Sequence, residues 1–94
     1  MRPDDPNGKQ DRPDAGTLAL MALAWTLADD RRAERLLSLT GLDGDTLRDG
    51  LAERIVQSAV LGFLADHEPD LLACADAIGA RPQELIAARE TLSR

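Results

Sequence analysis

Apolar residues recur at three- and four-residue spacing in six segments of the chain, beginning at residue 18. This spacing is typical of the buried side of an α-helix, and the leucine and alanine that dominate the segments favour helices over sheets. We therefore expect an all-α fold, a compact bundle of five or six short helices. The pattern predicts helices over about 18–28, 31–39, 44–50 and 53–65, a fifth with Pro69 in its opening turn, and a sixth that opens at Pro82.

Capping residues and glycines mark the ends of these predicted helices. Gly41 and Gly79 are placed to end the second and fifth helices in the left-handed conformation. The start of the fifth helix stays open between Asp66 and Glu68, since Pro69 fits the opening turn in either case. The expected N-caps of the first three helices, whose side chains accept hydrogen bonds from backbone N–H groups, are Thr17, Asp29 or Asp30, and Asp43.

Most of the predicted helices carry a single apolar stripe, and the stripes define the expected core. Helix 53–65 has the longest stripe, with Arg54 and Gln57 on its opposite side. The third predicted helix should point Leu47 and Leu51 inward. The residues expected to be buried on the last three helices are Val56, Ala59, Val60, Phe63, Leu64, Leu71, Cys74, Ala75, Ile78, Leu85, Ala88 and Leu92.

The helix over 18–28 differs from the others because it carries large apolar residues on two opposite sides. The two sides are formed by Leu18, Met21 and Trp25 and by Leu20, Leu23 and Leu27, with alanines between them. Either the helix is sandwiched between other helices, or one of its sides meets another chain. We take Leu18, Met21 and Trp25 as the candidate interaction face.

Two parts of the chain share one pattern, in which a helix, a glycine and a short link lead into a second helix. Gly41 corresponds to Gly79, and Leu47 to Leu85. The pattern predicts two similar αα-hairpins of the helix-turn-helix type within the bundle.

Residues 1–16 contain three prolines, two glycines and no large apolar residue after Met1. Such a segment cannot offset its ordering entropy by burial. We expect residues 1–16 to be a disordered tail and residues 17–94 to form a single helical domain.

The net charge and the cysteine content limit the expected cellular location and the kinds of binding partner. The net charge of −6 disfavours contact with nucleic-acid backbones and anionic lipids, and suits a basic protein surface. Cys74 is the only cysteine, so an intramolecular disulfide is excluded. The apolar run over 18–28 is shorter than the roughly 20 residues of a membrane span, and acidic rather than basic residues precede it. We expect a cytoplasmic protein that does not contact a membrane.

The residue inventory argues against catalysis, and we expect no enzyme activity, no bound metal and no cofactor. His67 is the only histidine, and Cys74 falls on an apolar stripe, where a thiol is a packing group rather than a nucleophile. Asp43 and Asp45 resemble the start of a calcium loop, but Arg54 stands where that loop requires a bidentate glutamate. Neither a Gly-rich phosphate loop nor a small-molecule site is evident.

An alternative function is DNA binding by residues 71–92 as a helix-turn-helix. Ala75 and Gly79 have the small-residue spacing that lets two helices cross over a tight turn. However, residues 70–94 carry four acidic side chains against three arginines, and the expected recognition helix begins with Gln83 and Glu84. This balance disfavours binding to nucleic acid.

Four segments of the chain, taken together and in this order, form a characteristic pattern: 19–28, 36–43, 60–66 and 77–84. With Trp25 in the first and the turn around Gly41 in the second, they resemble a small all-helical family of unknown function found in alphaproteobacteria, over about residues 17–92. The sequence departs from that family at Gly62, where members more often carry a larger or acidic residue, and at Gly44, where proline is common. The resemblance implies a bacterial cytosolic setting and carries no catalytic residues across.

The sequence thus favours a non-catalytic interaction or adaptor module that presents a helical surface to a protein partner or to a second copy of itself. Such a surface is expected to appear as an apolar patch that the monomer leaves exposed. DNA binding through residues 71–92 is the alternative.

Overall fold

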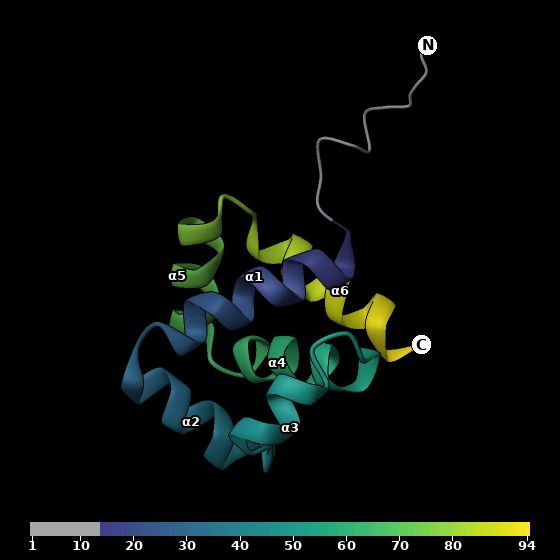
Figure 1. Cartoon of the computed structure of the whole chain (residues 1–94). Helices are drawn as coiled ribbons and strands as arrows, with labels where there is room; N and C mark the ends of the chain where they lie inside the picture. Colours follow the sequence, from purple (N-terminus) through teal and green to yellow (C-terminus); the bar gives the residue numbers. More distant parts are fainter. Residues whose placement is uncertain (1–13) are drawn as a thin grey trace.

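The structure is a computed structural model, and it describes residues 14–94. All regular secondary structure in this range is helical, which confirms the predicted all-α bundle (Figure 1). The six helices are α1 (Ala15–Leu27), α2 (Asp30–Thr40), α3 (Gly44–Asp49), α4 (Arg54–Ala65), α5 (Glu68–Ile78) and α6 (Pro82–Ser93).

The start of α1 lies earlier than expected, and Thr17 as its N-cap is wrong. Asp14 is the N-cap, and its Oδ1 accepts a hydrogen bond of 2.8 Å from the Thr17 N–H. Aspartate and threonine both cap helices well. Asp14 lies further from the helix centre than Thr17, so capping at Asp14 gives the longer helix. Ala15 and Gly16, which we assigned to the tail, are therefore helical. The predicted disorder of residues 1–13 lies outside the described residues.

The other helix ends follow local rules. Asp29 and Asp43 cap α2 and α3 through hydrogen bonds to backbone N–H groups, which settles the choice between Asp29 and Asp30. Gly41 and Gly79 both adopt the predicted left-handed conformation, each with φ of 75°. The residue that precedes α5 is His67, so neither Asp66 nor Glu68 is its cap.

Helix α4 lies in the middle of the bundle, with α1 and α6 packed over it and α2 and α3 below (Figure 1). Its most extensive contact is with α6. Because several helices surround α4, its buried arc is wider than the predicted stripe and includes Leu61, Gly62 and Gln57. Gln57, expected on the exposed side, is buried and donates a hydrogen bond of 2.7 Å to the Leu51 carbonyl. Ala59, expected in the core, is half-buried.

Helix α1 buries one arc, and that arc is centred on its small residues. Ala19, Ala22 and Thr26 are almost completely enclosed, whereas Leu20 and Leu27 are more than two-fifths exposed. The interpretation that α1 buries large residues on two opposite sides is therefore wrong. Small side chains at the centre of the arc let the backbone of α1 approach its neighbours closely, so helices α2, α4, α5 and α6 all contact it.

The two predicted hairpins are α2 with α3 and α5 with α6. Leu47 and Leu85 occupy corresponding positions on the second helix of each hairpin, and both are buried. Leu51 does not point inward as expected, because α3 ends at Asp49 and the chain leaves the helical path; its side chain is 38% exposed. Within residues 14–94, no helix has the length and apolar character needed to cross a membrane.

Candidate docking groove on helix α4

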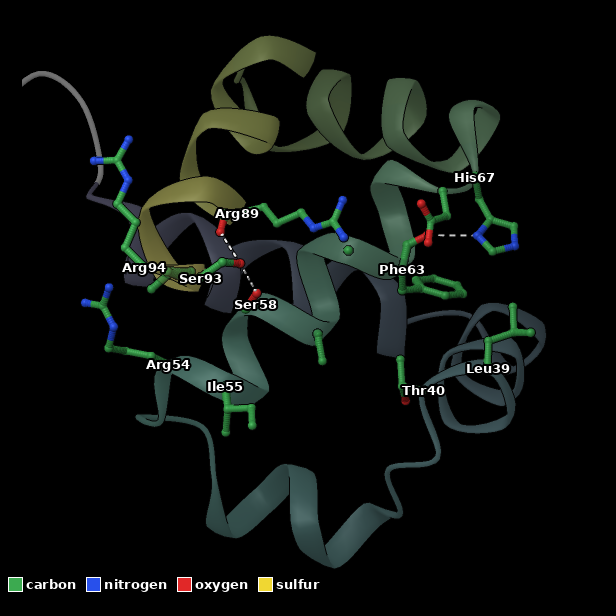
Figure 2. Close-up of a pocket in the computed structure, with 14 residues that line it drawn as sticks. Leu39, Thr40, Arg54, Ile55, Ser58, Phe63, His67, Arg89, Ser93 and Arg94 are labelled. Carbon is green, nitrogen blue, oxygen red and sulfur yellow. Dashed lines mark hydrogen bonds between the residues drawn. The ribbon is translucent and has the colours of Figure 1, made fainter.

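The outward side of α4 forms the floor of an open groove with a volume of about 810 Å³ (Figure 2). The C-terminal end of α2 contributes Leu39 and Thr40 to one wall, and the end of α6 contributes Leu92 and Ser93 to the other. The floor is lined by Ile55, Ser58, Ala59, Gly62 and Phe63. Three helices that are distant in sequence thus build one surface.

The groove contains the two most exposed large apolar side chains of the described residues. Ile55 is 76% exposed and Leu39 is 61% exposed. Figure 2 shows Ile55 toward the end of the groove where α4 begins, and Leu39 toward the end that holds His67. Ile55 lies outside the apolar stripe of α4, and an apolar residue off the stripe is the sequence signal that could have indicated this surface.

Positive charge accompanies these apolar positions. Arg54, Arg89 and Arg94 line the groove, and among the described side chains that line it Asp66 is the one carboxylate. Arg54 is held in place because its Nη2 donates a hydrogen bond of 2.6 Å to the Thr91 carbonyl. The groove is therefore locally basic on a chain whose net charge is −6.

Arg89 crosses the middle of the groove over Gly62 (Figure 2). A Cβ on Gly62 would lie 3.3 Å from Arg89 Nε, 3.5 Å from Cζ and 3.5 Å from Nη2. These nearly equal distances place that point above the plane of the guanidinium, so the face of the group lies against α4. Within residues 14–94 the guanidinium makes no hydrogen bond or ion pair, and its N–H edges remain available.

Hydrogen bonds fix both ends of the groove. The Oγ atoms of Ser58 and Ser93 lie 2.7 Å apart and join α4 to α6, while the Ser93 hydroxyl also donates to the Arg89 carbonyl (Figure 2). At the other end, His67 Nδ1 lies 2.8 Å from the Phe63 carbonyl oxygen, and the two rings are 5.0 Å apart. Hydrogen bonds within the chain thus hold the α6 wall and the His67 end of the groove to α4.

The family described as a protein of unknown function (DUF3572) matches residues 12–94. The chain belongs to this family. The match covers all six helices of the DUF3572 chain, and so includes every wall of the groove. No curated protein and no solved structure matches.

The face predicted from sequence on the DUF3572 chain lies on α1, outside the groove. Leu18 is buried in the core, whereas Met21 and Trp25 are half-buried. Sequence reasoning missed Arg32, whose guanidinium carbon lies 3.7 Å from the centre of the Trp25 ring and whose Nη2 donates 2.7 Å to the Trp25 carbonyl. Trp25 is therefore covered by a side chain of its own chain.

The structure does not bring Cys74 and His67 of the DUF3572 chain to one site. Cys74 is fully enclosed in the core, as its position on the apolar stripe predicted, and burial raises the pKa of its thiol to about 11. His67 lines the groove and has one ring nitrogen engaged by the Phe63 carbonyl. A thiol held neutral inside the core cannot act as a nucleophile on a groove ligand.

Proposed function

We propose that the chain is a non-catalytic protein-interaction module of the bacterial cytoplasm, and that it binds a segment of a partner protein in the groove on α4. One observation carries this proposal: Ile55 and Leu39, the two most exposed large apolar side chains of the described residues, line the same groove. Burial of exposed apolar surface favours association, and a hollow between three helices is a common acceptor for an amphipathic segment.

The chemistry of the groove supports a binding role over a catalytic one. Its polar side chains are three arginines, hydroxyl groups, one carboxylate and His67, and the one thiol of the chain faces the core. A histidine whose Nδ1 contacts a carbonyl has one nitrogen left for a ligand. Within residues 14–94, Asp66 has no second carboxylate side chain in the groove with which to share acid and base roles.

The same geometry favours a protein partner over DNA at residues 71–92. This part of the chain has two arginines: Arg81 pairs with Glu84 at 3.6 Å, and Arg89 extends over Gly62 into the groove. Few cations are left for phosphates on the outer side of α6.

The test is a comparison of three forms of the full chain as baits in lysate from the source bacterium. They are the unaltered protein, Ile55→Glu, and Leu72→Glu as a matched control, since Leu72 is half exposed on α5 outside the groove. We expect the unaltered and Leu72→Glu baits to retain at least one protein in common. The amount of that protein retained by the Ile55→Glu bait should be at least tenfold lower. Circular dichroism melts establish that both variants fold.

Retention of the same proteins by all three baits would refute a docking role for the groove, as would retention of no protein. Enrichment of nucleic acid on the baits, reversed by salt, would instead support the DNA-binding alternative.

A further inference from the structure

We infer that the segment bound in the groove is acidic, with carboxylates beside apolar residues, and that Arg89 is the residue that binds those carboxylates. This inference rests on the proposed docking function and names the chemistry of its partner. It also reverses the expectation from net charge, which suggested a basic partner surface.

The first support is the contrast between the groove and the whole chain. Among the described side chains, three arginines and one carboxylate line the groove, whereas the chain as a whole has a net charge of −6. An acidic segment is therefore repelled by most of the surface and attracted at the groove, which directs it to one site. Exposed apolar side chains alone would attract many partners, and the charge adds selectivity.

The second support is the state of Arg89. Its guanidinium face rests on α4 where Gly62 has no side chain, so contact with the helix restricts the group without using its N–H donors. A guanidinium edge with free donors matches a carboxylate through two parallel hydrogen bonds. Ile55 lies toward one end of the groove from Arg89 and Leu39 toward the other, which sets apolar contacts on both sides of the charged one (Figure 2).

Other occupants fit less well. A second copy docked groove to groove would place arginines against arginines, and like charges at close range oppose that arrangement. The segment before residue 14 holds no large apolar residue after Met1, and so lacks groups to bury on Ile55 and Leu39. A phosphate backbone would use the arginines and leave these two apolar side chains without contacts. An acidic, apolar segment of another protein uses both.

The test is selection of binders to the full chain from a displayed library of random 16-residue peptides, at low salt. Peptides whose binding is lost with Ile55→Glu are kept, synthesised, and titrated by fluorescence anisotropy. Titrations use the unaltered chain, Arg89→Gln, and Arg48→Gln as a matched loss of charge on an exposed residue of α3 outside the groove. Circular dichroism melts verify that the variants fold.

We expect the kept peptides to be enriched in Asp and Glu beside Leu, Ile or Phe. Their affinity should fall at least tenfold with Arg89→Gln, fall with added salt, and change less than twofold with Arg48→Gln. Kept peptides that are neutral or basic, or that bind Arg89→Gln as tightly as the unaltered chain, would overturn this inference and leave the docking function standing. A library that yields no binder sensitive to Ile55→Glu would count against both.

Discussion

The thiol of Cys74 is enclosed by the core, and burial raises its pKa to about 11 from the ordinary value of 9.0. The folded state therefore favours the neutral thiol more strongly than the unfolded state does. The resulting contribution to stability is fully present below pH 9 and is lost as the pH rises from about 9 through 11.

We expect Cys74 to resist thiol reagents in the folded protein at pH 8 and to react at the rate of a free cysteine in denaturant. The rate of reaction with a chromogenic disulfide measures this directly. Because only opened molecules expose the thiol, the native rate should rise with urea in parallel with unfolding. Complete labelling within seconds in buffer would contradict the enclosed position of Cys74.

Arg32 joins α2 to the end of α1 through two contacts on Trp25. Its guanidinium covers the indole ring and donates a hydrogen bond to the Trp25 carbonyl, while its backbone N–H is bonded to the cap residue Asp29. Among residues 14–94 the buried Arg32 Nε has no hydrogen-bond partner, so this arrangement also has an energetic cost.

Arg32→Met should lower the free energy of unfolding by about 1–3 kcal/mol, because a cation–π contact and a charged hydrogen bond are lost. It should also change the fluorescence of Trp25, the only tryptophan. Arg31→Met, one position earlier and exposed, is the control and should do neither. Equal urea midpoints for the two variants would mean that the Trp25 contacts contribute nothing to stability.

At the scale of the elements, the link from α3 to α4 requires a glycine at one position. A Cβ on Gly50 would lie 2.7 Å from Val56 Cγ2 and 2.9 Å from the Thr46 carbonyl oxygen, so α4 could not start where it does. Gly44, the first residue of α3, has open space around the same point.

Gly50→Ala is therefore expected to destabilise the protein by about 1–3 kcal/mol through overpacking, whereas Gly44→Ala should change its stability by less than about 0.5 kcal/mol. Urea unfolding curves with unchanged slope give both values. A Gly50→Ala variant as stable as the unaltered chain would show that α4 can shift to admit a methyl group.

The elements also show what the sequence alone could and could not predict. Gly41, Gly79, Asp43 and Pro82 act on neighbouring backbone groups, so the sequence indicated these helix boundaries correctly. The buried arc of α1 depends on which helices approach it, and the sequence cannot choose between a face of leucines and a face of alanines. Gln57 was placed on the wrong side of α4 for the same reason, since its partner, the Leu51 carbonyl, belongs to an irregular link.

At the scale of the whole molecule, the groove exists because α2, α4 and α6 converge. Ile55 and Leu39 are separated by two links and the whole of α3, and Arg89 reaches Gly62 from a helix later in the chain. Sequence reasoning could flag Ile55 as an apolar residue off its stripe. It could not place Leu39 and Arg89 beside it, because that requires the packing of three helices.

The position of a bound segment decides whether this groove is the binding surface. Amide chemical-shift mapping of the isotope-labelled chain with a selected acidic peptide locates it residue by residue. We predict the largest changes at Leu39, Gly62 and Ser93, with α5 unaffected. Changes centred on Met21 and Trp25, with the groove amides unmoved, would contradict the assignment of the groove as the docking site.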